Sequence, residues 1–396
     1  MGLTVAGAAR PAALLPLTSL RFFAAASVVI FHMDQLATSP QVGGLYRAVF
    51  SEGHAGVNFF FLLSGFVLAY SYRDRFTSLT PGKLWDYSAA RFARIYPLHL
   101  FAMALSVLFV VFYANWPRPQ GSALWKATLS QLTLTQAFFP NSSIHFSYNA
   151  VAWSLSAEMF FYVTLPFILW LSNRKTFGSS AFIVSMAAMV WVIQVLVTDR
   201  IAHSTRPIAG WACSIFPVAR WPEFAIGIAV GLMFSRHGMP STGSRPSWRW
   251  TILEIGSMLL LATFLYMKDL VPSEMRVTTY YTPMFCVLIC LFARQGGHLS
   301  AILSGRVLVY LGEISYAMYL VHALLILLMS VLFYDMRMYF PLQFGAVALV
   351  LCIAFASLCH LAIEVPLRKK CLSWLSRKPS LTLLKQPSSN IASRAA

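Results

Sequence analysis

Two residues that can do chemistry interrupt the first long apolar stretch of the chain, residues 18–37. Arg21 and His32 are separated by ten residues, FFAAASVVIF, of which only Ser27 is polar. In an α-helix, eleven positions make three turns plus roughly 20°, so both side chains share one face about 16 Å apart. A neutral imidazole can act as a general base, and a guanidinium can bind phosphate. The alternative is a buried histidine that hydrogen-bonds to a neighbouring helix.

A third ionisable residue, Glu158, lies in a later apolar stretch, NAVAWSLSAEMFFYVTLPF, which begins at Asn149. Glu158 lies about three turns into this stretch, at a depth similar to that of His32. An ionisable residue at such depth is a functional candidate with an expected partner. A contact between Glu158 and His32 would fix one imidazole tautomer and raise its basicity, but the sequence alone does not place them together.

Arg91 and Arg94 form a basic pair at the start of another apolar stretch, residues 94–113. Because they are three positions apart on a helix, they face the same way at the membrane surface. Guanidinium groups bind phosphate bidentately, so the pair suits a phosphate-bearing ligand. For each arginine alone, a topology anchor is the simpler interpretation.

Further residues within or at the edge of apolar stretches are candidates for substrate contact or for packing. Ser64 and Gly65 permit close helix approach, as does Gly227 near the expected pair Arg220–Glu223. A second histidine at membrane depth is either catalytic or a hydrogen-bonding group. This additional set comprises Ser64, Trp153, Arg220, Phe224, Gly227, Tyr319 and His322.

The composition identifies an integral membrane protein. Hydrophobic residues make up 58% of the 396 and charged residues only 11%, whereas soluble domains carry about 25% charge. The net charge of +17 therefore reflects membrane topology, and we expect no nucleic-acid partner. The six cysteines show no metal-site spacing, and we expect no metal. We predict an all-α, polytopic helical bundle with about ten spans, at residues 18–37, 54–72, 94–113, 150–171, 180–198, 222–235, 252–268, 279–294, 308–333 and 341–363.

The basic residues predict the orientation of these spans. With both termini on one side, that side collects 21 of the 30 lysines and arginines, so we assign it to the cytoplasm. Residues 114–149 then form the longest external loop, large enough to cap an external opening. The short, glycine-rich sixth span is expected to be tilted, broken or re-entrant.

We divide the chain into a membrane domain, residues 1–366, and a basic cytoplasmic tail, residues 367–396, that is partly disordered. Pro366 is expected to end the last helix.

The chain resembles the membrane-bound acyltransferase-3 family of carbohydrate O-acyltransferases, from about residue 17 to 366. The most specific match is an arginine, ten residues and a histidine, here Arg21 and His32. A second is the spacing of Arg220, Phe224 and Gly227. Supporting segments are FFFLLSGF, the Arg91/Arg94 pair, WSLSAEMFFY, ISYAMYLVH and EVP. The chain looks like the stand-alone form of the family, without an additional soluble domain.

The resemblance implies an acyl-coenzyme A donor that arrives from the cytoplasm, with no permanently bound cofactor. The acceptor would be a hydroxyl of an extracytoplasmic carbohydrate or glycolipid, and acetyl is the commonest acyl group. In this scheme His32 is the general base, assisted by Arg21 and Glu158, and Arg91 and Arg94 bind the donor phosphates. The protein would lie in the inner membrane as a multi-pass protein with both termini in the cytoplasm.

Two other functions compete with this one. A transporter or flippase of a lipid-linked sugar could use His32 and Glu158 as a proton relay. A non-catalytic membrane scaffold would not need His32. The Arg21–His32 register and the paired arginines favour the acyltransferase, because neither alternative requires them.

Overall fold

The computed structural model describes residues 12–112, 122–174, 177–204, 206, 208–237 and 245–375, so most of the predicted tail lies outside the described residues. Every regular element in these ranges is a helix. In chain order they are α1 (Leu15–Phe31), η1 (Asp34–Thr38), α2 (Gly43–Ala48), η2 (Phe50–Glu52), α3 (Ala55–Tyr72), η3 (Arg75–Thr77), α4 (Pro81–Phe112), α5 (Ser122–Thr133), η4 (Gln136–Phe138), α6 (Ser142–His145), η5 (Ala150–Ala152), α7 (Trp153–Ser172), α8 (Ser180–Ala202), α9 (Ala209–Ser214), α10 (Pro217–His237), α11 (Trp248–Tyr266), η6 (Lys268–Leu270), α12 (Ser273–Thr278), α13 (Thr282–Arg294), α14 (His298–Leu303), α15 (Arg306–Leu332), α16 (Tyr334–Tyr339), α17 (Pro341–Cys359), η7 (His360–Glu364) and α18 (Val365–Leu375).

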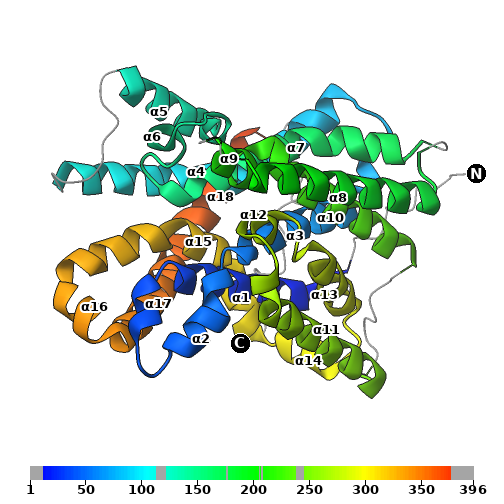
Figure 1. Cartoon of the computed structure of the whole chain (residues 1–396). Coiled ribbons are helices and arrows are strands. Elements are labelled where there is room, and N and C mark those ends of the chain that lie inside the picture. The colour runs from blue at the N-terminus through cyan, green and yellow to red at the C-terminus, as the bar shows by residue number, and fades with distance from the viewer. Residues whose placement is uncertain are drawn as a thin grey trace, which may run out of the picture.

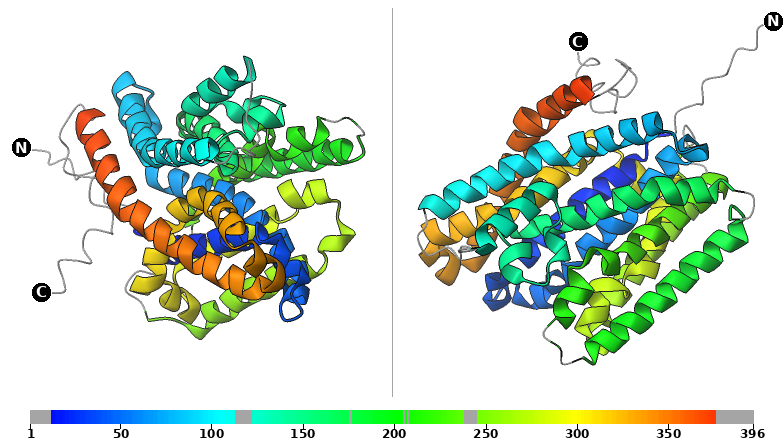
Figure 2. Two further views of the ribbon diagram at one scale, coloured as in Figure 1. Left: turned by 90° about the vertical axis from the view of Figure 1, so that its left-hand side faces the viewer. Right: turned by 90° about the horizontal axis from the view of Figure 1, so that it is seen from above.

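The long helices lie side by side in one bundle, with the short helices grouped at their ends and edges (Figures 1 and 2). Within the described residues, eight helical stretches are long and apolar enough to cross a membrane. They correspond to the second and the fourth to tenth predicted spans. The first predicted span contains the shorter α1, of 17 residues, and the third lies in the 32-residue α4. The predicted all-helical membrane bundle is confirmed.

Two predictions about helix ends are wrong. The sixth span is neither short nor broken, because α10 runs for 21 residues. The charges of Arg220 and Glu223 made the apolar stretch look short in the sequence. In the structure both residues are buried and paired with each other inside the helix. Pro366 does not end the last span either. The π-helical turn η7 leads directly into α18, and Pro366 is the second residue of α18. The helical stretch runs on from Pro341 to Leu375, with the irregular π turn directly before the proline.

The helices divide into a buried centre and a lipid-facing periphery. In the spans that contain α3, α15 and α10, 72%, 61% and 56% of the most apolar stretch is buried, against 17% for α8 and α11. A helix that is apolar all round and mostly exposed needs lipid around it. The functional side chains therefore have to come mainly from the central helices.

Glycines allow the central helices to approach closely. A Cβ atom on Gly227 of α10 would lie 2.1 Å from the carbonyl oxygen of Leu62 in α3, and one on Gly65 of α3 would lie 2.2 Å from that of Phe224. The predicted close packing at these positions is confirmed. Small residues allow backbones in a membrane to gain van der Waals contact, which lipid-exposed leucines do not provide.

A close contact at a glycine also joins α1 to α15. A Cβ atom on Gly312 would lie 1.9 Å from the carbonyl oxygen of Thr18. Ser19 adds a hydrogen bond of 2.5 Å from its hydroxyl to the carbonyl oxygen of Leu303, next to the start of α15. Because α1 and α15 are held together here, residues further along both helices also meet.

The segment predicted as a capping external loop contains α5, η4 and α6. It packs on α7 through η4 and meets α4 at the last turn of α5. The ring of His99 in α4 donates from Nε2 to the carbonyl oxygen of Gln131 at 2.9 Å. The Gln136 amide donates to the carbonyl oxygen of Ala152 at 2.8 Å. The segment thus supports the start of α7.

We predict that Gly227→Ala destabilises the protein, whereas Gly256→Ala does not. The new methyl group at position 227 collides with the backbone of α3, while a Cβ at Gly256 in α11 meets no atom within 4 Å. Overpacking of this kind typically costs about 1–3 kcal/mol. The measurement is the thermal unfolding midpoint of each purified variant in detergent. Equal midpoints for the two variants would contradict the close α3–α10 contact.

Candidate active site

His32 lies at the end of α1, directly beside His322 of α15. α1 is helical through Phe31, and the backbone N–H of His32 still donates to the carbonyl oxygen of Val28. Arg21 and His32 are therefore about three turns apart on one face, as the spacing predicts. Nδ1 of His32 lies 3.3 Å from Nε2 of His322. His322 is fully buried, whereas the His32 side chain is exposed.

The hydrogen-bond partners assign the tautomers of the two rings. Nδ1 of His322 lies 2.6 Å from the carbonyl oxygen of Tyr319. Nδ1 of His32 lies 2.9 Å from the carbonyl oxygen of Val28. Carbonyls only accept, so both Nδ1 atoms carry the proton, and Nε2 of a neutral His322 faces the N–H of His32. Nε2 of His32 then keeps its lone pair and has no hydrogen-bond partner among the described residues. One nitrogen is fixed and the other is free, which is the arrangement of a general base.

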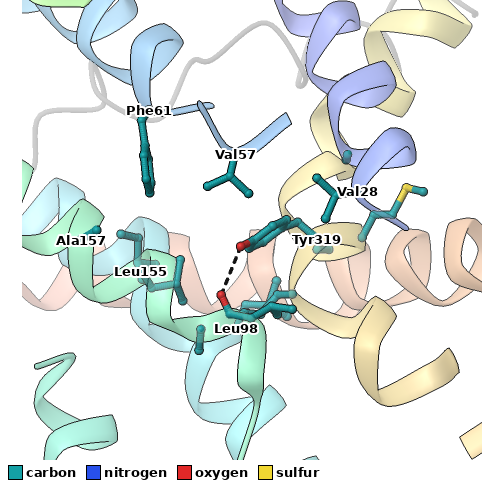
Figure 3. Close-up of a cluster of buried hydrophobic side chains, with 14 of the residues drawn as sticks. Val28, Val57, Phe61, Leu98, Leu155, Ala157 and Tyr319 are labelled. Carbon is teal, nitrogen blue, oxygen red and sulfur yellow. Dashed lines mark hydrogen bonds between the residues drawn. The ribbon is translucent and has the colours of Figure 1, made fainter. Parts of the chain in front are cut away.

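Tyr319 connects this pair to α7. Its hydroxyl lies 2.8 Å from the Ser154 hydroxyl and 3.2 Å from the carbonyl oxygen of Val151. Figure 3 shows Tyr319 among side chains from several helices, including Val28 and Leu155. The start of α7 therefore lies at the level of the two histidines.

A cluster of charges lies at the opposite end of α1. Arg94 forms an ion pair with Glu364 of η7, and the Glu364 carboxylate also accepts from Nδ1 of His360 at 3.0 Å. Arg21 lies within electrostatic reach of Arg94, Glu364 and Glu158. Among the described residues, Arg21 has no hydrogen-bond or ion-pair partner, and its side chain is partly exposed. Its guanidinium is available to a ligand.

Arg91 occupies an aromatic cage on the same side. Its guanidinium lies 5.6 Å from the ring centres of both Tyr72 and Tyr162 and 6.0 Å from that of Tyr87. It also donates to the Tyr72 hydroxyl at 3.2 Å. The two predicted donor-binding arginines thus lie in one polar region, and both have partners within the protein.

Glu158 belongs to this cluster and does not contact His32. Its carboxylate accepts from the Tyr162 hydroxyl one turn further along α7. The contact between Glu158 and His32, which the sequence left open, is therefore not formed. The reason is the position of α7: Ser154 already lies beside Tyr319, so Glu158 is a turn further toward the arginines. A proton relay that passes directly between His32 and Glu158 has no contact to use.

Arg220, the first residue of the second motif, is buried between α3, α7 and α10. Its Nε lies 3.1 Å from Oε1 of Glu223, and it donates to the side chain of Asn58 in α3. Its guanidinium also lies 6.0 Å from the ring centre of Trp153. These contacts agree with the structural interpretation of the pair.

The two other motif residues and Ser64 also lie along α3 and α10. The Phe224 ring stacks on Phe161 of α7, with ring centres 4.9 Å apart. Because Gly227 has no side chain, the backbone of Leu62 can pack directly against it. Ser64 is partly exposed on α3.

Sequence reasoning missed one further cluster, around Glu52. Although Glu52 precedes α3 in a short connection, it is buried. It pairs with Arg276, and its Oε2 accepts from the Tyr281 hydroxyl at 3.1 Å. Lys268 contributes a hydrogen bond of 2.7 Å to the Ser51 hydroxyl. The local sequence around Glu52, SEGH, carries no signal that separates it from an exposed connection.

In the part of the chain that the structure describes, no group of three or more His, Cys, Asp and Glu side chains could hold a metal ion.

Comparisons with known proteins show what the chain as a whole is similar to. A family model named Acyl_transf_3 and described as an acyltransferase domain matches residues 17–359. The acyltransferase MdmB of Streptomyces mycarofaciens is 32% identical over 95% of this chain and 96% of its own length. The "Putative acetyltransferase ORF330" of Acidianus two-tailed virus is 25% identical over 89% of this chain and 90% of its own length.

A third relative, protein 2 in the picA locus of Rhizobium radiobacter, is 28% identical over 36% of this chain and 78% of its own length. No solved structure matches the chain. The family match covers most of the chain, from the start of α1 to the end of α17, and includes both histidines. The chain belongs to the acyltransferase-3 family and is a multi-pass membrane acyltransferase.

Proposed function

We propose that the protein is an O-acyltransferase that moves an acyl group from cytoplasmic acyl-coenzyme A to a hydroxyl of an extracytoplasmic carbohydrate or glycolipid, with His32 as general base. The observation that carries the proposal is the geometry of His32, whose Nδ1 is held by Val28 and His322. Family membership supports the acyl transfer itself. The acyl-coenzyme A donor, the carbohydrate acceptor and the inner-membrane location are part of the proposal.

The chemistry follows from one free imidazole nitrogen. Nε2 of His32 takes the proton of the acceptor hydroxyl as its oxygen attacks the thioester carbonyl carbon. When the C–S bond breaks, the leaving thiolate accepts this proton from Nε2, and the products are an ester and free coenzyme A. His32 returns to its starting tautomer. His322 would keep the ring in position throughout, because a neutral Nε2 can accept from Nδ1–H of His32.

The charges at the other end of α1 suit the donor phosphates. Arg21 and His32 are about 16 Å apart along α1, a separation that an extended pantetheine arm can bridge. Arg21 has no protein partner in the described chain, and Arg91 and Arg94 lie in the same polar region. Guanidinium groups bind phosphate bidentately. We assign the phosphates to this region and the thioester to His32.

We predict that His32→Ala abolishes transfer while the protein still inserts and binds acyl-coenzyme A. Loss of a positioned general base should reduce the turnover number by about a hundredfold to ten-thousandfold. The measurement is transfer from labelled acetyl-coenzyme A by membranes that contain each variant. His203→Ala is the matched control, because that imidazole is largely exposed at the end of α8. A folded His32→Ala protein with near-parental turnover would refute the assignment.

We predict that His322→Ala lowers the turnover number and that His322→Gln restores part of it. The Gln side chain can place an oxygen near the position of Nε2 and accept from His32. Misplacement of a reacting group can cost up to about a hundredfold. The informative readout is turnover number against KM for the donor, since a packing defect alone would lower the amount of folded enzyme and change neither. Equal turnover in both folded variants would show that His322 does not position His32.

We predict that the double variant Arg94→Gln/Glu364→Gln binds coenzyme A more weakly than Glu364→Gln alone. The double variant removes both members of the ion pair and so leaves no unpaired charge in the bundle. A lost phosphate contact typically costs about 1.5–3 kcal/mol. The measurement is calorimetric titration of coenzyme A into purified protein. Equal affinities for coenzyme A would restrict Arg94 to a structural role. A titration of Arg21→Gln against the unaltered protein would test the unpaired arginine in the same way.

A further inference from the structure

The short helix α5 exposes its large apolar side chains and buries Ser130 and Gln131. Trp125, Leu129 and Leu124 are 58%, 53% and 46% exposed, whereas Gln131 and Ser130 are 0% and 3% exposed. A helix on a water-soluble surface shows the opposite pattern. The exposed side of α5 therefore faces an apolar environment.

The last turn of α5 is hydrogen-bonded to the rest of the protein. The Gln131 amide donates to the carbonyl oxygen of Ser147 at 2.8 Å, and the Gln131 backbone oxygen accepts from His99 of α4. The Tyr96 hydroxyl donates to the carbonyl oxygen of Leu132. These bonds fix which side of α5 points outward. The exposure of its apolar side chains therefore follows from the orientation of the helix and not from the rotamers of single side chains.

The contacts also place α5 at membrane depth. Its last turn meets Tyr96 and His99, which lie near the middle of α4. At 1.5 Å per residue, α5 is about 18 Å long and the remainder of α4 beyond His99 is about 20 Å. Figures 1 and 2 show α5 beside this C-terminal part of α4. The same part of α4 belongs to the third predicted span, so α5 and this span share one depth range.

We propose that α5 is embedded in the membrane leaflet at the C-terminal end of α4, with its exposed apolar side in contact with lipid acyl chains. Under the proposed orientation this is the external leaflet. Two observations favour lipid over a protein partner. The exposed side continues onto α4, where Phe92 and Leu100 are also exposed on either side of Tyr96. The only charged residue of α5 is Lys126, which lies 5.8 Å from the ring centre of Trp125, a pairing typical of membrane interfaces.

The embedded helix would hold the N-terminal end of α7 in place. After α5, Gln136 donates to the carbonyl oxygen of Ala152, and Asn149 donates to that of Leu320 at 2.7 Å. Leu320 is next to Tyr319, the carbonyl partner of His322. Lipid contact at α5 therefore supports one wall of the site, although α5 contributes no residue to it.

The test is spin labelling of single cysteines in a variant whose six native cysteines are replaced by alanine, reconstituted into phospholipid nanodiscs. Labels are placed at Trp125 and Leu129. The lipid-facing control is Leu196 of α8, 61% exposed in a candidate span, and the aqueous control is the exposed Ser143. Collision with oxygen is compared with collision with a water-soluble nickel complex. We expect the ratio at positions 125 and 129 to match that at 196 and to exceed that at 143 several-fold.

A ratio at 125 and 129 equal to that at 143 would overturn the proposal, and dipolar broadening between labels would reveal a second copy of the chain on α5 instead. The unaltered protein provides a measurement that does not depend on the cysteine-free variant. In nanodiscs that contain a phospholipid with a diazirine in its acyl chain, photolysis should modify the peptide that includes Leu129. Absence of label there, with label present on α8, would also refute the embedding. Neither result depends on catalytic activity.

Discussion

Charged and polar groups inside a bilayer have no water to bond to, so this protein pairs them within the bundle. Arg220 meets Glu223 and Asn58, Arg276 meets Glu52, and Arg94 meets Glu364. Removing one partner of such a pair leaves an uncompensated charge, which is far more costly than a surface salt bridge is worth. Against this background, unpaired groups are informative. Nε2 of His32 and the guanidinium of Arg21 lack protein partners in the described chain, and both lie on the same face of α1.

The positions of these two groups depend on close helix contacts. α1 is held against α15 where the missing side chain of Gly312 leaves room for the backbone at Thr18, and this contact aligns the end of α1, with His32, beside His322 in the interior of α15. α3 and α10 pack with similar closeness through Gly65 and Gly227. Because backbone atoms meet directly at these places, helix positions are set by shape and not by flexible side chains. A general base needs such rigidity, since its proton transfer depends on geometry.

The length of α1 links the two halves of the proposed reaction. Its first turns lie among arginines, tyrosines and carboxylates, and its last residue leads to the histidine pair. The helix sets the distance between the place where a phosphate-bearing donor would be recognised and the place where its acyl group would react. Glu158 and Tyr162 belong to the first place, and Tyr319 and Ser154 to the second. Helix α7 carries residues of both, so α1 and α7 together define the distance between them.

What the sequence determined by itself was local. Hydropathy identified the membrane bundle and nearly all spans, and helical periodicity placed Arg21 and His32 on one face, because both depend only on neighbouring residues. The order of motifs also identified the family. Tertiary structure decided which side chains meet. His322 lies 290 positions from His32, Arg94 pairs with Glu364 of η7, and the last turn of α5 meets the middle of α4. Buried pairs such as Arg220–Glu223 also hid the length of α10, because charges that neutralise each other in the bundle look like helix ends in a hydropathy pattern. Contacts between distant segments are set by packing, which no local pattern encodes.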